Sequence, residues 1–122
     1  MLEAEIQMGI CQWLAFALPA NALVHHSPNE GRHSVQYRVK QKRLGMTPGW
    51  PDLEIFVPAA AWFNPPAWAP IFFEVKTAKG VISKNQSSVI KSLAAVGCHA
   101  SVVRSIDEAE AVLADLVKLN VS

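Results

Sequence analysis

The sequence predicts an α/β fold in which a mixed β-sheet is flanked by helices. The 122 residues match the length of one small domain, and 51% of them are hydrophobic, which is enough for a buried core. Short runs of β-branched and aromatic residues alternate with segments of helical periodicity. The resulting order, α-β-α-β-β-α-β-α, is typical of a sheet covered by helices. Because no internal repeat or domain boundary is visible, we expect residues 1–122 to form one domain.

The first half of the chain predicts two helices and two strands. Apolar residues recur on one side of a helical wheel from Leu2 to Ala17, and Pro19 ends that helix. A second, basic helix stops at Gly45, a residue suited to the position just after a helix end. The predicted elements, in chain order, are a helix over 2–17, a strand over 22–26, a helix over 34–44 and a strand over 50–57.

The second half begins with a proline-rich segment that we expect to be a rigid hairpin connection, because proline fixes φ. Ser83 is a good N-cap residue for the helix that follows the next strand, and Gly97 ends that helix. Ser105 is expected to cap the last helix, with Glu108 completing a capping box. The predicted elements are the connection over 57–70, a strand over 71–76, a helix over 83–96, a strand over 99–103 and a helix from 105 onward.

The net charge of +1 conceals an uneven distribution. Residues 31–104 contain ten basic residues and three acidic ones, whereas the segments on either side are acidic. The three acids of this basic middle segment are Asp52, Glu54 and Glu74. Carboxylates that could hold a metal therefore lie in the part of the chain best suited to attract phosphates.

Membrane and secreted classes of protein are disfavoured. An apolar run such as residues 57–63 is far too short to span a bilayer. The first residues carry Glu3 and Glu5 in place of a basic leader region. Cys11 and Cys98 are isolated from each other, which is typical of reduced thiols. We therefore expect a cytoplasmic protein with no membrane partner.

Asp52, Glu74 and Lys76 form the most informative pattern in the chain. Side chains alternate across a strand, so Glu74 and Lys76 should share one face of their strand. Asp52 lies in the neighbouring predicted strand and supplies a second carboxylate. Two carboxylates can hold a hard divalent cation, and a lysine beside them can position an attacking water. This set suits metal-assisted hydrolysis of a phosphodiester.

These residues resemble the signature of the PD-(D/E)XK nuclease superfamily, and a longer pattern is similar to the VRR-NUC family. A Glu-x-Lys triplet alone is common, whereas the ordered combination is specific and covers nearly the whole chain. The family includes small stand-alone proteins of bacteriophages and bacteria, so a phage origin fits the resemblance. The matching segments are Asn29-Glu30-Gly31, Gly45, Pro48-Gly49-Trp50-Pro51-Asp52, Phe73-Glu74-Val75-Lys76, Ser83-x-x-Gln86, Gly97 and Val102-Val103-Arg104-Ser105.

The resemblance implies a restriction-endonuclease-like fold and DNA cleavage that depends on Mg²⁺ or Mn²⁺. By position, it implies that Asp52 and Glu74 are the metal carboxylates, with the carbonyl of Val75 as a further ligand. It implies that Lys76 orients the water and offsets charge in the transition state. Gln86 resembles the family's glutamine on the helix after the motif, although a surface position on that helix is the alternative.

Two further acidic positions leave alternatives open. The family's early glutamate could be Glu3 or Glu5; Glu3 falls within the apolar stripe of the first helix, so a site on the inward face favours Glu3. Glu54 shares a strand face with Asp52 and is either a ligand or a solvated neighbour, and we favour the neighbour.

A basic run before the Asp52 strand is a candidate contact surface for DNA phosphates. The alternative is a solvated helix face. With no separate sequence-reading module visible, we expect recognition of DNA shape, such as flaps, branches or a Holliday junction. The resemblance also implies a homodimer, and the rival function is a non-catalytic DNA-binding or assembly protein that keeps the fold. The residues of the run are Arg32, Arg38, Lys40, Lys42 and Arg43.

Overall fold

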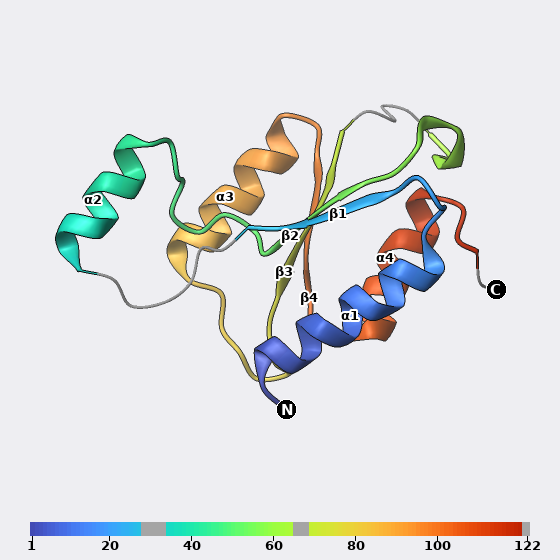
Figure 1. The fold of residues 1–122 in the computed structure, drawn as a ribbon, viewed down its shortest axis with the longest axis horizontal. Coiled ribbons are helices and arrows are strands. Elements are labelled where there is room, and N and C mark those ends of the chain that lie inside the picture. The colour runs from blue at the N-terminus through green and yellow to red at the C-terminus, as the bar shows by residue number, and fades with distance from the viewer. Residues whose placement is uncertain (28–33, 65–68, 121–122) are drawn as a thin grey trace.

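A mixed four-stranded sheet forms the centre of the protein (Figure 1). The structure is a computed structural model that describes residues 1–27, 34–64 and 69–120. The strand order β1-β2-β3-β4 follows the chain; β1 pairs with β2 and β2 with β3 in antiparallel fashion, while β3 and β4 are parallel. The strands are β1 (Leu23–His26), β2 (Leu53–Phe56), β3 (Ile71–Val75) and β4 (His99–Val103).

Helices lie on both sides of this sheet. Figure 1 shows α1 and α4 on one side and α3 on the other, with α2 set apart from all of them. The parallel pairing of β3 and β4 requires a crossover connection, and α3 supplies it. The helices are α1 (Glu3–Ala17), α2 (Val35–Arg43), α3 (Lys84–Ala95) and α4 (Ile106–Leu116), with a short 3₁₀ helix η1 (Ala59–Ala61) between β2 and β3.

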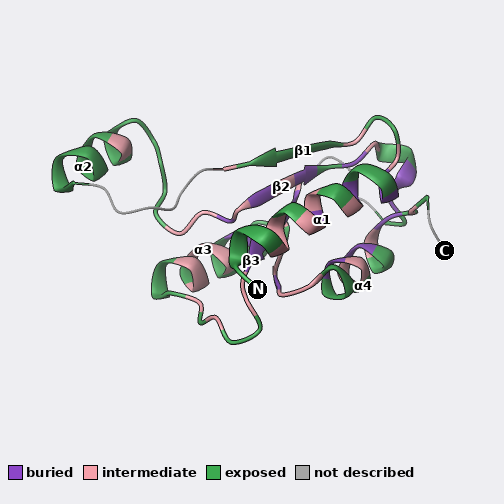
Figure 2. Ribbon diagram, turned by 60° about the horizontal axis from the view of Figure 1, so that its bottom comes forward, coloured by how far each residue is buried: buried purple, intermediate pink, exposed green. Residues whose placement is uncertain are grey.

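The main core lies between the sheet and the pair α1 and α4. Every residue of β3 is buried, as expected for a central strand with both faces covered. The buried side chains of α1 and α4 pack against one face of the sheet, and Figure 2 shows the buried stripe along the strands and the inner side of α1. Trp62, from the connection between β2 and β3, is part of this core. The largest completely buried members include Ile10, Leu14, Leu53, Ile55, Phe73 and Leu113.

The helix ends follow the predicted chemistry with one exception. Gly45 and Gly97 both adopt positive φ, at 101° and 95°, just beyond α2 and α3. Ser105 Oγ accepts the N–H of Glu108 at 3.1 Å, as predicted for an N-cap. The predicted capping box is wrong, however, because the carboxylate of Glu108 accepts the N–H of Arg104 at 2.9 Å instead of that of Ser105.

The predicted strand over 50–57 is shorter in the structure and begins only at Leu53. Gly49 has a φ of 84°, which is incompatible with an extended strand, and Pro51 has no N–H to donate to a neighbouring strand. This short approach leaves Asp52 immediately before β2, at the end of the sheet.

The basic helix α2 has no tertiary core of its own. Ser34 caps it by accepting the N–H of Tyr37 at 3.1 Å, but none of its residues is buried. Arg32 and the turn at 27–31 fall wholly or partly outside the described residues, as do Trp68 and part of the connection over 57–70. None of the helices in the described part of the chain is both long and apolar enough to cross a membrane.

Candidate metal centre

Three carboxylates converge where β2 and β3 meet the start of α1. Leu53 pairs with Phe73 in the antiparallel ladder, so Asp52 and Glu74 lie next to each other one residue beyond that pair. Glu3, in the first turn of α1, approaches the same point. Glu3, Asp52 and Glu74 each offer a carboxylate oxygen within 4.8 Å of the others. Residues separated by 71 positions in the chain are thus brought to one site by the packing of α1 on the sheet.

Glu74 is the centre of this cluster. Glu74 is only 2% exposed, which is rare for a carboxylate without a compensating partner. Oε2 accepts a hydrogen bond from Gln86 Nε2 at 3.0 Å, and Lys76 Nζ lies 3.9 Å from the same oxygen. Oε1 is buried and has no hydrogen-bond partner among the described residues. An unpaired buried oxygen is costly, so Glu74 Oε1 is a candidate ligand atom for a cation.

Asp52 is held by the sheet itself. Its Oδ2 accepts the N–H of Val75 at 2.8 Å, and its carbonyl accepts the N–H of Ser27 at 2.9 Å. The side-chain carboxylate and the backbone carbonyl of Asp52 are therefore both anchored to neighbouring strand segments. Anchoring of this kind fixes the direction of the carboxylate before any ligand arrives.

Burial and the neighbouring carboxylates both act on the proton equilibrium of Glu74. Burial, first, and then the adjacent Asp52 and the more distant Glu3 raise the pKa of Glu74 to about 8, while Lys76 acts in the opposite direction. A divalent cation would relieve this repulsion. Three carboxylates with an unpaired buried oxygen are the hard donor set that Mg²⁺ and Mn²⁺ prefer, so the residues present fit such an ion.

The metal-free protein should lose stability as pH rises through neutrality. The raised pKa means that folded Glu74 keeps its proton where the unfolded chain, at the ordinary value of 4.5, has released it. This contribution is complete below 4.5 and is lost as pH rises through about 8. Urea unfolding in EDTA at several pH values should show this decline, and Glu74→Gln, which cannot titrate, should show a smaller one. Equal pH slopes for the two proteins would contradict the prediction.

The structure separates the two candidate early glutamates. Glu5 Oε1 accepts the N–H of Leu2 at 3.0 Å, so its side chain turns back to cap its own helix. Glu3 joins Asp52 and Glu74 instead. Glu3, the residue that falls within the apolar stripe of α1, is therefore the glutamate that faces the other two carboxylates.

Gln86 connects the start of α3 to the carboxylate cluster. Its Oε1 accepts the N–H of Ser83 at 2.9 Å while its own N–H donates to Ser83 Oγ at 3.1 Å, a complete capping box. The amide nitrogen remains to hold Glu74 Oε2. One side chain thus both starts the helix and orients the buried carboxylate. Gln86 therefore contacts the carboxylate cluster, while its catalytic role stays a prediction.

Gly49 was not identified by sequence reasoning as a contact, although it lies within the recognised motif. A Cβ at this position would stand 2.5 Å from the carbonyl carbon of Asn85 and 2.7 Å from the nitrogen of Gln86. The loop before Asp52 therefore lies directly on the first turn of α3. Trp50 supports the same loop by packing edge-on against Phe72, with ring centroids 5.5 Å apart. The only signal in the sequence was the glycine itself, because glycine is the residue that most readily adopts a positive φ.

Gly49→Ala should destabilise the protein by about 2 kcal/mol or more, because positive φ and a backbone clash act together. Gly97→Ala is the matched control: its φ of 95° is also positive, but nothing lies within 4 Å of the added Cβ. Urea denaturation of both variants measures the difference, which reports the contact with α3. Equal losses of stability would show that the loop can move away from α3 at no cost.

The remaining predicted site residues lie in different surroundings. Glu54 accepts a hydrogen bond from Ser27 Oγ at 2.9 Å and lies 3.3 Å from His25 Nδ1, so it faces β1 and is not a member of the carboxylate cluster. The N–H of Val75 binds Asp52, and the role of the Val75 carbonyl as a ligand stays a prediction. The described basic residues Arg38, Lys40, Lys42 and Arg43 are all exposed and all on α2.

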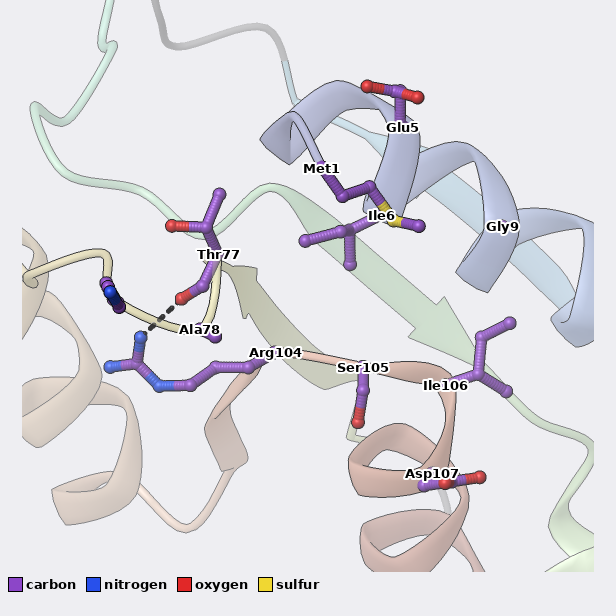
Figure 3. A pocket seen from close by; sticks show the side chains of 11 residues that line it. Met1, Glu5, Ile6, Gly9, Thr77, Ala78, Arg104, Ser105, Ile106 and Asp107 are labelled. Atoms are coloured by element: carbon purple, nitrogen blue, oxygen red, sulfur yellow. Dashed lines mark hydrogen bonds between the residues drawn. The ribbon is translucent and has the colours of Figure 1, made fainter.

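A cavity of about 700 Å³ lies between the start of α1, the loop after Lys76 and the start of α4. Figure 3 shows Arg104 extending along this loop, where one guanidinium nitrogen donates to the carbonyls of Thr77, at 2.6 Å, and Gly80, at 2.7 Å. The backbone N–H of Lys76 also donates to the carbonyl of Val103 at 3.1 Å. These bonds tie the backbone of Lys76 to the end of β4 and the loop after Lys76 to Arg104.

Comparisons with known proteins identify the family and the fold of the chain. A family model described as the VRR-NUC domain matches residues 3–107, most of the chain. Among solved structures, the chain is similar to a VRR_NUC domain protein, with a TM-score of 0.67 and 24% sequence identity over 93% of this chain and 86% of that one. At this level of identity the likeness shows the fold, and the predicted α/β fold is confirmed. No curated protein matches the chain.

Proposed function

Because the chain belongs to the VRR-NUC family of nucleases, we propose that it is a metal-dependent DNA endonuclease that hydrolyses phosphodiester bonds. The observation that supports this most directly is the buried Glu74 beside Asp52 and Glu3, with one oxygen lacking a partner among the described residues. A structural ion pair has no need of three adjoining carboxylates. We treat residues 1–122 as one nuclease domain.

Asp52, Glu74 and Glu3 would hold the cation, with the Val75 carbonyl as a further ligand. A bound Mg²⁺ or Mn²⁺ would supply Lewis-acid activation of the phosphate and lower the pKa of a water. The protein's contribution is to keep the carboxylates in place before the substrate arrives. Val75 N–H performs this for Asp52, and Gln86 performs it for Glu74.

We propose that Lys76 acts on the reacting groups. Its side chain is 13% exposed, and its ammonium is 3.9 Å from Glu74 Oε2, which leaves it at the rim of the carboxylate cluster. An ammonium does not ligate a metal, but it can orient an attacking water and stabilise negative charge on a phosphate. We assign it these two roles.

The helix α2 is the proposed contact surface for the DNA backbone. It carries four cations and no acid, and it buries none of its residues. A nine-residue helix is marginal in water by itself, so a helix of this kind gains most from a partner. The positive charge of α2 is complementary to DNA phosphates. The helix has no apolar side that could pack against a protein core.

Replacing all four basic residues of α2 by alanine should weaken DNA binding without removing cleavage at saturating DNA. Each lost phosphate contact should reduce the log–log salt slope by about 0.9 for duplex DNA. Fluorescence anisotropy at several salt concentrations measures the slope for the variant at Arg38, Lys40, Lys42 and Arg43. Lys118→Ala, an exposed lysine in the acidic C-terminal segment, is the control and should leave the slope unchanged. An unchanged slope in the quadruple variant would show that α2 is merely solvated.

Branched DNA is the proposed substrate class. The chain is small, so backbone contacts and DNA shape would supply the selectivity. A homodimer would present two metal centres to a two-fold substrate such as a four-way junction. Cleavage of labelled linear, flap and four-way-junction DNA with Mg²⁺, Mn²⁺ or EDTA tests the proposal. Binding without cleavage under every metal condition would favour the rival function, a non-catalytic DNA-binding protein.

A further inference from the structure

His26 lies beside the metal centre without belonging to the carboxylate cluster. It is the last residue of β1 and pairs with Leu53 across the ladder, next to Asp52. Its ring Nδ1 is 3.0 Å from the carbonyl oxygen of Asp52 and 2.9 Å from the amide nitrogen Nε2 of Gln7 on α1. The same ring nitrogen therefore contacts Asp52, just before β2, and Gln7 on α1, the helix that also carries Glu3.

The chemistry of these contacts decides which nitrogen bears the proton. A carbonyl oxygen can only accept, so Nδ1 must donate to Asp52. The amide of Gln7 can turn its oxygen toward Nδ1 and accept as well, because its two ends are nearly equal in shape. The Asp52 contact therefore favours the tautomer protonated at Nδ1, and this tautomer requires the Gln7 amide to be turned so that its oxygen, and not Nε2, faces the ring. In this arrangement Gln7 restrains the ring and the ring restrains the backbone of Asp52.

The position of Gln7 links this restraint to Glu3. The two residues are four apart on α1, so they share one side of the helix. Glu3 reaches the carboxylate cluster, and Gln7 reaches His26 one turn further on. A shift of α1 would therefore move a carboxylate and its supporting ring together.

We propose that His26 is a positioning residue of the metal centre, which fixes Asp52 through its Nδ1–H while Gln7 holds the ring. The inference rests on the proposed function, because it assigns the purpose of the bond to the metal carboxylate. The carbonyl of Asp52 has a second donor, the N–H of Ser27 at 2.9 Å, so loss of the ring should misalign the residue without unfolding β1.

Three substitutions separate the two ring nitrogens. Asparagine places an amide N–H near the position of Nδ1 and keeps the bond to Asp52, whereas glutamine reaches the position of Nε2 and loses it. His26→Ala and His26→Gln should weaken Mn²⁺ binding by about 10–100-fold, the usual effect of removing a supporting partner of a metal ligand. His26→Asn should restore affinity to within a few-fold of the original protein, on the order of ordinary surface substitutions.

Titration calorimetry with Mn²⁺ alone, without DNA, measures these affinities on the complete chain. His25→Asn is the matched control, because the neighbouring histidine contacts Glu54 at 3.3 Å and not the carboxylate cluster; its affinity should not change. Thermal unfolding in EDTA shows whether each variant remains folded. Nitrogen-15 spectra of the imidazole should show the Nδ1-protonated tautomer in the original protein.

Rescue by glutamine but not by asparagine would overturn the proposal, since it would place the function at Nε2. Unchanged Mn²⁺ affinity in His26→Ala would also overturn it. Failure of the original protein to bind Mn²⁺ is a different result, because that would remove the proposed nuclease function itself. An Nε2-protonated tautomer would contradict the bond on which the inference depends.

Discussion

Asp52→Asn and Glu74→Gln should each reduce DNA cleavage to near the detection limit while the protein stays folded. An amide oxygen is a poor substitute for an anionic one in binding a hard cation. Glu74→Gln should even stabilise the metal-free protein at neutral pH. The pKa of Glu74, raised to about 8 by burial and by the neighbouring carboxylates, shows that the folded protein favours the neutral side chain.

The measurement is a time course of cleavage with Mg²⁺ or Mn²⁺, together with DNA binding in EDTA. Asp52→Asn should bind DNA at least as well as the original protein, because a negative charge near the phosphates is gone. Glu74→Gln should bind DNA about as well as the original at neutral pH, because the pKa of about 8 already keeps Glu74 neutral when no metal is bound. Glu54→Gln is the matched control: this carboxylate contacts Ser27 and His25, so cleavage should persist. Wild-type rates in either site variant would remove the assignment of the carboxylates.

Lys76→Ala should lower turnover by about 10²–10³-fold, the typical effect of losing one preorganised group that stabilises developing charge. Metal affinity should change much less, because the ammonium is 3.9 Å from Glu74 Oε2 and supplies no ligand atom. Loss of the positive charge removes an influence that lowers the pKa of Glu74, so the remaining decrease in affinity should be largest at low pH.

Single-turnover cleavage at saturating metal, combined with calorimetry, separates the two effects of Lys76. Lys79→Ala is a suitable control, because this exposed lysine follows in the same loop and should leave turnover nearly unchanged. If metal affinity falls in parallel with activity, Lys76 maintains the carboxylate cluster and takes no part in the chemistry.

The element order and most helix ends were predictable because they depend on nearby residues. Ser83 and Gln86 form a capping box within one turn. Gly97 ends the same helix, and its N–H donates to the carbonyl of Ala94, three residues earlier. The single error, the box at Glu108, arose where a tertiary position competed: Arg104, at the end of β4, offered its N–H to the same carboxylate. Local rules cannot foresee which of two adjacent donors is turned toward a side chain.

The sequence by itself determined the alternation of elements, the apolar side of α1 and the motif that contains Asp52, Glu74 and Lys76. Only the tertiary structure decided that Glu3 meets the other two carboxylates, that Gly49 lies on the start of α3 and that His26 Nδ1 lies 3.0 Å from the carbonyl oxygen of Asp52. The physical reason is separation along the chain. Periodicity encodes local conformation and the side that is buried, whereas distances of a few ångströms between remote residues are set by how helices and strands pack.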